Sequence, residues 1–516
     1  MTPDRSSLWS SLAGDFDVLV IGGGATGLGV AVDAATRGYR TALVEAGDFA
    51  QATSSRATKL VHGGVRYLGS GQIHLVTEAL RERAILLRAA PHLVRRQAFV
   101  VPMYRQWELP YYGAGLLLYN LLAGTASLGP TCVMGAAVVE RVPGVARTGL
   151  KGGVVYYDAQ FNDARLAMAL ARTALDHGAT AINYVRCERL IHEAGRVTGA
   201  LVRNAESGAS MTVRAALVIN ATGIFSDELR KMDHPGAAPM LALSRGTHIV
   251  VGADVLGGDA AIIVPKTRDG RVIFAIPWQG RVLIGTTDLA APAPAVEPGY
   301  TEEEVDYLLK QIGPYLDRPI GKRDILSVFS GLRPLVSGKA ARTSQLSREH
   351  HIQLSDTGLI TIAGGKWTTY RRMAQDTLDF AIRHGLLPSA PCLTRTLKIH
   401  GAVENGTDGV LGEYGSDRAE IEALIAADPG LAQRIDRDLP YIRAQVVYAL
   451  RSEMARTLED VLSRRTRALL LDAQAALRCA PEVAKLMVRE LGHDPAWEQA
   501  QARAFTELAR EYYLLR

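Results

Sequence analysis

Apolar runs and helical patterns alternate at the start of the chain. Residues 16–21 (FDVLVI) form a short apolar run that is typical of a fully buried strand. A glycine-rich turn follows, then a helical pattern that ends near Gly38, and then a second apolar run at residues 41–45 (TALVE). A strand, a glycine turn, a helix and a strand within about 30 residues predict a βαβ unit.

The middle of the chain has a different pattern. Four strand-like segments (SRGTHIVV, DAAIIVP, RVIFAIPW and RVLIGTTD) follow one another between residues 241 and 288. Strands repeated at this spacing predict an antiparallel sheet separate from the βαβ unit. Residues 358–370 (GLITIAGGKWTTY) then restore the strand, glycine turn and helix, which indicates that the chain returns to the first domain.

Helical patterns with arginine-rich faces dominate after Pro391, so a domain boundary is expected just before it. Thr457 and Asp460 have the three-residue spacing of a capping box at the start of a helix.

One apolar segment, residues 111–124 (YYGAGLLLYNLLAG), is too short to span a bilayer. We expect a buried helix there, with a helix lying in a membrane surface as the alternative.

Composition bounds the class of protein. A chain of 516 residues with 48% hydrophobic and 22% charged residues predicts two or three folded domains and excludes a disordered protein. Only 6% of the residues are aromatic, which argues against stacking platforms for single-stranded nucleic acid. The four cysteines are too far apart for a thiolate zinc site or a disulfide framework and fit a reducing compartment. No signal peptide, transmembrane segment or metal site is predicted.

Charge is unevenly distributed along the chain. The net charge is +5, yet residues 391–516 carry 17 basic and 19 acidic side chains, while residues 56–105 carry nine basic and two acidic ones. Residues 81–96 within that stretch predict a basic helix. We expect one or two of these cations to serve the chemistry and the others to face anionic lipid headgroups or water.

The glycine turn after the first strand has the spacing GxGxxG. Gly22 permits the tight turn, Gly24 lets the backbone approach a pyrophosphate, and Gly27 lets the helix pack on the strand. Glu45 ends the second strand, where a carboxylate accepts hydrogen bonds from a ribose. The unit therefore predicts a dinucleotide site but does not choose between NAD and FAD.

Motifs further along the chain make that choice. They are IGGGATGLG, ATSS…KLVHGGVRYL, SRGTHIVV, SGLRPL, GGKWTTYRRMA and YALRSEMARTLEDVLSRRTR, and they span nearly the whole chain. In content and order they resemble the FAD-dependent, quinone-linked glycerol-3-phosphate dehydrogenases.

The resemblance implies an α/β fold in three parts: a glutathione-reductase-like FAD-binding Rossmann domain, an antiparallel-sheet domain that binds substrate and faces the membrane, and an all-helical C-terminal domain. Their expected ranges are, in that order, 1–80 with 151–230 and 355–390; 81–150 with 231–354; and 391–516.

It also implies oxidation of sn-glycerol 3-phosphate to dihydroxyacetone phosphate by hydride transfer to FAD, with electrons passed to membrane quinone. The implied protein is a homodimer. The basic stretch at residues 56–105, the apolar run at residues 111–124 and the need to reach quinone predict peripheral binding to an anionic membrane surface on the cytoplasmic side. No nucleic-acid partner is expected.

Site residues carry over by motif. The cofactor-binding positions are Gly22, Gly24, Gly27, Glu45, Thr53, Ser54, Ser55, Lys59, Gly223, Gly364, Gly365 and Lys366. The substrate-binding positions are Arg66, Tyr67, Arg333 and Arg348. The catalytic positions are His62, His248, Arg333 and Lys366.

The chemistry of the substrate explains these residue types. Arginine clamps a phosphate dianion with two parallel hydrogen bonds. A histidine near neutral pKa can take the hydroxyl proton, and either His62 or His248 could be this base. Arg333 or Lys366 would stabilise the developing alkoxide. Arg56 lies where a small residue is commoner, and either a salt bridge or a bias of the site towards phosphate would explain it.

Three other functions stay open. An oxygen-using glycerol-phosphate oxidase would have the same pocket, and an amino-acid oxidase of related fold would use its arginine for a carboxylate. A non-catalytic flavin-fold protein that binds a membrane or nucleic acid is suggested by the RRTR cluster at residues 464–467, although the net charge of −2 after residue 391 argues against nucleic acid.

Overall fold

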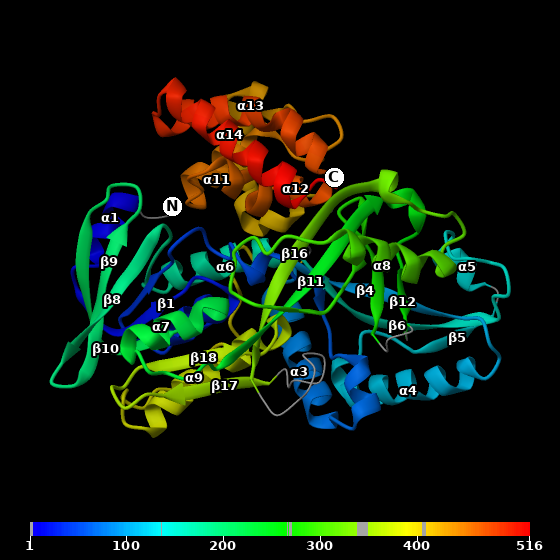
Figure 1. Ribbon diagram of the computed structural model, residues 1–516, viewed down its shortest axis with the longest axis horizontal. Helices are drawn as coiled ribbons and strands as arrows, with labels where there is room; N and C mark the ends of the chain where they lie inside the picture. Colours follow the sequence, from blue (N-terminus) through cyan, green and yellow to red (C-terminus); the bar gives the residue numbers. More distant parts are fainter. Residues whose placement is uncertain are drawn as a thin grey trace.

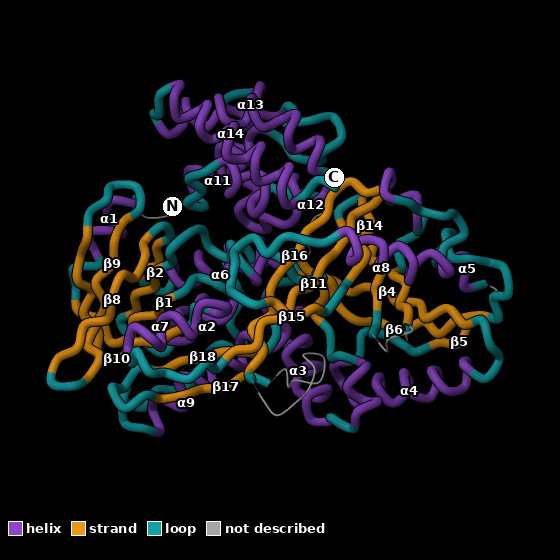
Figure 2. Tube along the Cα trace, viewed as in Figure 1, coloured by secondary structure: helices purple, strands orange, loops and turns teal. Residues whose placement is uncertain are grey.

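The computed structural model describes residues 4–135, 137–265, 267, 271–337, 349–404 and 409–515. Two sheets lie beside each other, and the C-terminal helices form a layer above them (Figure 1). Figure 2 shows the strands gathered in these two groups, with most of the helices outside them. The predicted three-part α/β fold is confirmed.

The first sheet has the strand order β17-β18-β10-β1-β2-β7, and β9 and β8 extend it from β10. The strands β18, β10, β1, β2 and β7 are parallel. Its strands are β1 (Asp15–Ile21), β2 (Thr41–Val44), β7 (Thr180–Ile182), β8 (Val185–Glu193), β9 (Arg196–Asn204), β10 (Ser210–Asn220), β17 (His350–Leu354) and β18 (Ile360–Gly364). The predicted βαβ unit is β1, α2 and β2.

Helix α2 contacts both α6 and α9 beside this sheet. Buried valine, leucine and alanine side chains of β1 and α2 belong to one core with those of β10 and α6. The helices of this part are α1 (Arg5–Ser11), α2 (Ala25–Thr36), α6 (Asp163–Asp176), α7 (Ser226–Asp233) and α9 (Tyr370–Arg383).

The second sheet has the order β15-β11-β14-β13-β12-β4-β6-β3, with β16 paired to β11 and β5 to β6. Its pairs are antiparallel except β4 with β12. Its strands are β3 (Leu60–Val61), β4 (Val94–Met103), β5 (Cys132–Met134), β6 (Gly152–Phe161), β11 (Leu241–Gly252), β12 (Ala261–Val264), β13 (Ile273–Trp278), β14 (Arg281–Gly285), β15 (Leu289–Ala291) and β16 (Ile325–Val336). Its helices are α3 (Ile73–Ala89), α4 (Glu108–Ala123), α5 (Val138–Arg141) and α8 (Glu302–Ile312).

The expected domain ranges stay a prediction. Strand β6 falls within the range 151–230 that was expected in the FAD domain, but it pairs in the second sheet. Strand β17 falls within the range 231–354 that was expected in the substrate domain, but it pairs in the first sheet.

The C-terminal part is helical and shares an apolar core with α4 and the second sheet. At its centre the backbone amide of Thr457 donates to Asp460 at 2.9 Å and the amide of Asp460 donates to Thr457 at 3.2 Å, so the predicted capping box is confirmed. The helices are α10 (Arg418–Ala427), α11 (Arg443–Ser452), a π-helical turn η12 (Asp460–Arg465), α12 (Ala468–Leu471), α13 (Ala473–Leu491) and α14 (Pro495–Tyr512).

The expectation of a buried helix at residues 111–124 is wrong. Of the residues of α4, only Leu116, Tyr119 and Ala123 are buried. Leu117 and Leu121 are 51% and 68% exposed. No helix in the described ranges is long and apolar enough to cross a membrane.

Candidate active site

The predicted glycine turns meet at one edge of the first sheet. Ile21 at the end of β1 pairs with Val44 of β2 and with Asn220 of β10, and Asn220 pairs with Thr361 of β18. Because these strands are parallel, the turns that follow them lie at the same edge. This edge therefore carries Gly22, Glu45, Gly223 and Gly364 together.

The first turn needs its glycines. Gly22 has φ +113°, and a Cβ on Gly27 would lie 1.9 Å from the carbonyl oxygen of Gly22, which leaves no room for a side chain. Helix α2 begins directly after Gly24, and no side chain of Gly24 can cap it. Its first backbone amide, that of Ala25, donates to the hydroxyl of Ser54 at 2.9 Å. The start of a helix carries positive potential, and Ser54 adds a hydroxyl beside it, an arrangement that suits a pyrophosphate.

Glu45 lies beside this turn, as predicted. Its carboxylate accepts hydrogen bonds from the backbone amides of Gly23 at 2.6 Å and Gly47 at 2.8 Å. Burial raises the pKa of Glu45, and these two amides oppose that rise.

The serine-rich segment that follows β2 is held by groups from distant parts of the chain. The Thr53 hydroxyl donates to the Leu332 carbonyl at 2.7 Å, and the Trp367 indole donates to the Ser54 carbonyl at 2.8 Å. Arg56 forms an ion pair with Glu297, which confirms the salt-bridge explanation for this arginine.

A cavity of about 780 Å³ opens between these elements. Seven of the predicted site residues line it: Thr53, His62, Tyr67, His248, Arg333, Gly365 and Lys366. A second part of its wall is apolar and comes from α4 and the second sheet, with Tyr112, Leu116, Tyr156, Ile263 and Phe274. The cavity thus joins a cationic wall to an apolar one.

Arg333 on β16 is fixed at the polar wall. Its guanidinium donates to the hydroxyl of Thr286 at 3.0 Å and to the carbonyl of Thr287 at 3.2 Å. A Cβ on Gly246 would lie 2.1 Å from its Nη2 atom. The glycine of the SRGTHIVV motif is therefore needed to make room for this arginine.

His248 lies on β11, between β16 and β14, and is buried. Its Nε2 atom is 3.0 Å from the hydroxyl of Thr58. Its ring stacks on Phe329 with centroids 4.8 Å apart. Burial above all, and then the positive charges of Arg333 and Lys59, hold the pKa of His248 well below its usual value, so the ring is neutral at pH 7.

Two further predicted catalytic groups, His62 and Lys366, line the same cavity. The backbone amide of His62 donates to the Thr368 hydroxyl at 3.3 Å, and its ring meets the edge of Phe274. The Lys366 ammonium lies 4.0 Å from the centre of the Tyr67 ring, a cation–π contact.

Three other predicted residues, Arg66, Arg348 and Lys59, are not among the described residues that line the cavity. Arg66 lies in the turn η2 (Val65–Ser70), but its side chain is outside the described part of the structure. Arg348 lies outside the described residues altogether. Lys59 does not line the cavity: its ammonium is fully buried, 2.6 Å from the carboxylate of Asp163 and 2.9 Å from the Ser55 carbonyl.

Asp163 and Arg467 are residues that sequence reasoning missed. Asp163 accepts from the backbone amide of Ala57 at 2.9 Å as well as from Lys59, and Arg467 donates to the Ser55 carbonyl at 2.6 Å. In the sequence, Asn162 and Asp163 indicate only the start of a helix. Ala57 and Lys59, which donate to Asp163, lie 106 and 104 positions away, so no local pattern reveals its role. The buried position of a lone carboxylate is invisible until the fold is known.

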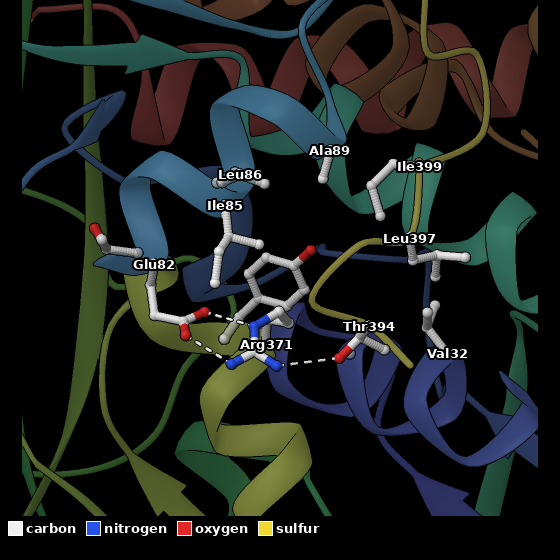
Figure 3. A pocket seen from close by; sticks show the side chains of 12 residues that line it. Val32, Glu82, Ile85, Leu86, Ala89, Arg371, Thr394, Leu397 and Ile399 are labelled. Atoms are coloured by element: carbon white, nitrogen blue, oxygen red, sulfur yellow. Dashed lines mark hydrogen bonds and ion pairs between the residues drawn. The ribbon is translucent and has the colours of Figure 1, made fainter. Parts of the chain in front are cut away.

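A second, much smaller cavity lies between α2, α3 and α9. Its volume is about 10 Å³, hardly enough for one water molecule. Figure 3 shows Arg371 beside it, bonded to Glu82 of α3 and to Thr394. These contacts tie the helices together, and the cavity is too small to be a ligand site.

Within the described ranges, no group of three or more histidine, cysteine, aspartate or glutamate side chains is placed to hold a metal ion.

The chain matches two family models. Residues 17–371 match the family described as FAD dependent oxidoreductase, and residues 355–500 match the C-terminal domain of alpha-glycerophosphate oxidase. The first match covers well over half of the chain. Together with the glycine turns at the sheet edge, it defines an FAD-dependent oxidoreductase.

Curated relatives narrow this class. The probable mitochondrial glycerol-3-phosphate dehydrogenase of Caenorhabditis elegans is 40% identical, over 99% of this chain and 75% of that protein. The human mitochondrial glycerol-3-phosphate dehydrogenase is 40% identical, over 96% of this chain and 73% of that protein. The chain belongs to the family of FAD-dependent glycerol-3-phosphate dehydrogenases, as its motifs predicted.

Solved structures agree. The X-ray structure of the glycerol-3-phosphate dehydrogenase from Bacillus halodurans, complexed with FAD, superposes with a TM-score of 0.79 at 29% identity and covers 98% of this chain and 97% of that one. The L-alpha-glycerophosphate oxidase from Mycoplasma pneumoniae, with FAD bound, shares the fold at 17% identity, with a TM-score of 0.55 over 71% of this chain and 94% of that one.

The residues at the sheet edge fit FAD, the cofactor predicted from the sequence. The glycine cradle has no space for side chains, the positive end of α2 faces the turn, and the carboxylate of Glu45 lies beside the turn, where it could bind a ribose. The large cavity adjoins this edge at Thr53 and Gly365 and offers room for a flavin ring and a small substrate.

Proposed function

We propose that the protein oxidises sn-glycerol 3-phosphate to dihydroxyacetone phosphate, with FAD as hydride acceptor and membrane quinone as the final electron acceptor. The observation that carries the proposal is the cavity of about 780 Å³, whose lining includes Arg333, Lys366, His62 and His248. Membership of the glycerol-3-phosphate dehydrogenase family supports the same substrate.

The cationic wall suits the phosphate of the substrate. Ser244, Thr286 and Thr287 hold the Arg333 guanidinium in place, so its positive charge is fixed at the wall where a phosphate would bind. Lys366 adds a second positive charge beside Tyr67. Arg66 and Arg348 stay predictions as further phosphate ligands.

Oxidation of the secondary alcohol removes one proton and one hydride. FAD, when bound, supplies the acceptor for the hydride. An imidazole, that of His62 or of His248, takes part in moving the hydroxyl proton. The cations Arg333 and Lys366 stabilise the negative charge that develops on the substrate oxygen as the proton leaves.

The cofactor contacts follow from the sheet edge. Glu45 would bind the ribose of the adenosine half, and the α2 start with Ser54 and Ser55 would bind the pyrophosphate. The turns at Gly223 and at Gly364 and Gly365 would pass close to the rest of the cofactor, because glycine admits close approach of the backbone.

Helix α4 supports the membrane and quinone parts of the proposal. It exposes Trp107, just before its start, together with Tyr111, Leu117 and Leu121, while Tyr112 and Leu116 of the same helix line the cavity. An apolar helix face with an aromatic end is suited to the headgroup region of a bilayer. A quinone in the bilayer would reach the flavin through the apolar part of the cavity.

Two further expectations carry over from the sequence: peripheral attachment on the cytoplasmic side, and a homodimer, which rests on the resemblance.

The second candidate is an oxygen-using glycerol-phosphate oxidase, because residues 355–500 match a model described as the C-terminal domain of such an oxidase. The test compares oxidation of glycerol 3-phosphate with a short-chain quinone and with oxygen alone. We expect fast turnover with the quinone and little hydrogen peroxide without it. Rapid peroxide formation in the absence of quinone would establish the oxidase instead.

A further inference from the structure

Thr58 occupies a place in the site that the motifs did not assign to any role. It lines the cavity, and its hydroxyl oxygen is 3.0 Å from Nε2 of His248. His248 is the only hydrogen-bond partner of this hydroxyl in the described part of the chain.

The His248 ring cannot turn away from Thr58. Its cross-strand neighbours are Phe329 on β16 and Gly285 on β14. The ring lies nearly parallel to Phe329, at an interplanar angle of 11°, and a Cβ on Gly285 would lie only 2.1 Å from its Cδ2 atom. Phenylalanine on one strand and the bare backbone of a glycine on the other therefore fix the plane of the imidazole.

The position of Thr58 is fixed through the residues on either side of it. The carboxylate of Asp163 accepts from the amide of Ala57 at 2.9 Å and from the ammonium of Lys59 at 2.6 Å, so it holds the residues on both sides of Thr58. Lys59 has φ +63°, a left-handed conformation that a residue with a side chain adopts only where its surroundings impose it.

The second ring nitrogen decides which way this hydrogen bond runs. Nδ1 of His248 is buried and has no hydrogen-bond partner among the described residues. A proton on Nδ1 would be a buried, unpaired N–H donor, which folded proteins rarely tolerate. The neutral ring therefore carries its proton on Nε2 and donates it to the Thr58 oxygen.

We propose that Thr58 is a further catalytic residue, whose hydroxyl accepts a hydrogen bond from Nε2 of His248 and donates its own proton to the reacting oxygen of the substrate. A hydroxyl that accepts from one donor becomes a better donor itself. Such a donor stabilises the negative charge that develops on that oxygen during oxidation. The inference rests on the proposed function for the identity of the substrate.

The first experiment reads the hydrogen bond without turnover. Holoenzyme labelled with ¹⁵N-histidine is examined by NMR at pH 7, and the His248 signals are identified by their loss in His248→Gln. We expect a protonated Nε2 and an unprotonated Nδ1. A proton on Nδ1 would overturn the proposed pair.

The second experiment follows anaerobic reduction of the bound flavin at saturating glycerol 3-phosphate. Thr58→Val keeps the side-chain shape without the hydroxyl, and we expect the rate constant to fall about 10- to 100-fold. Thr58→Ser keeps the hydroxyl and should stay within about threefold of the original chain. Should Thr58→Val fail to bind flavin, Thr58→Ala replaces it in the comparison.

Thr377→Val is the matched control. Thr377 is fully buried in α9, and its hydroxyl donates only to the Met373 carbonyl at 2.8 Å. Its loss should leave the rate unchanged. If the original chain is reduced and Thr58→Val is reduced equally fast, the inference is wrong while the proposed function stands. If glycerol 3-phosphate does not reduce the original chain, the proposed function fails, and the substrate contact of Thr58 fails with it.

Discussion

The C-terminal domain and the region of α3 and α4 place their charged and apolar side chains in opposite ways. In the C-terminal domain, Arg464 and Arg465 are fully buried and share the carboxylate of Asp48, which lies in the first-sheet domain. In the other region, helix α4 leaves Leu117 and Leu121 exposed. The arginine cluster at residues 464–467, which the sequence suggests is a surface patch, is buried. The apolar segment at residues 111–124, which the sequence suggests is buried, has an exposed face.

The difference teaches where each region finds its partner. Buried arginines are tolerated only with carboxylates and carbonyls around them. Here Asp48 of the first-sheet domain joins Glu459 and Asp460 of the C-terminal domain. Arg464 and Arg465 of the RRTR cluster therefore join the C-terminal domain to the first-sheet domain through Asp48, a contact called the internal joint below. These arginines are not available to a nucleic acid. An exposed apolar helix has no such partner in the described chain, which is why we propose a bilayer for it.

The basic stretch at residues 56–105 divides in the same way. Arg83 is buried and paired with Asp158 at 2.7 Å, so it cannot face headgroups as expected from the sequence. Arg81 and Arg88 of the same helix are exposed. Only a part of this positive charge is available to an anionic surface.

The largest effect is expected at the internal joint. Arg465→Met leaves Asp48 short of one partner inside the protein, and we expect a loss of about 3–5 kcal/mol in the free energy of unfolding. Urea denaturation followed by circular dichroism measures it.

Arg478→Met is the matched control, because Arg478 pairs with Asp436 and Asp438 in the same domain but is 44% exposed. We expect its cost to be at most about 1 kcal/mol. Equal losses in the two variants would show that the buried cluster is no joint.

The proposed membrane contact of helix α4 is tested by placing negative charges on its exposed face. Leu117→Glu combined with Leu121→Glu should lower binding to anionic liposomes at least about tenfold, because each buried leucine contributes about 1.5–3 kcal/mol. The melting temperature should stay the same, since both side chains are exposed. Co-sedimentation measures the binding.

Met232→Glu, on the exposed side of α7, serves as the control and should bind like the unchanged protein. Undiminished binding of the double variant would rule out α4 as the membrane contact.

A smaller effect is expected when pH changes the stability of the fold through His400. His400 pairs with Asp176 at 2.5 Å and with Asp417 at 3.0 Å, between the first-sheet domain and the C-terminal domain. Burial alone would lower its pKa, but the two carboxylates outweigh burial and raise the pKa of His400 to about 9. A raised pKa stabilises the fold fully below the ordinary value near 6.5, and this stability is lost as pH rises through about 9.

The melting temperature should therefore fall between pH 6.5 and 9, and His400→Gln should flatten this fall. The pKa of Asp417 is lowered to about 2, so this carboxylate stays ionised throughout the range. An unchanged slope in the variant would contradict the assignment to His400.

Local sequence patterns predicted the parts of the fold that depend on residues close together in the chain. The run at residues 16–21 became β1, and Gly22 and Glu45 meet at the sheet edge because a βαβ unit brings the two strands side by side. The capping box at Thr457 is local as well. The order of the motifs identified the family, and with it FAD.

The remaining features depend on contacts between distant segments. The expected contact of Lys59 with FAD stays a prediction, and its ion pair with Asp163, 104 residues away in the sequence, could not be predicted from local patterns. Helix α4 has the composition of a core helix, and only the assembled fold leaves its outer face uncovered. Thr58 carries no signal of its own, because its role depends on a histidine 190 residues away in the sequence.

Anaerobic reduction of the bound flavin tests the central claim most directly. Glycerol 3-phosphate should bleach the flavin absorbance of the purified protein, while glycerol, which lacks the phosphate, should not. In Arg333→Met the bleaching should require a much higher concentration of glycerol 3-phosphate. A flavin that glycerol 3-phosphate leaves oxidised, or that glycine or a D-amino acid reduces instead, would contradict the account.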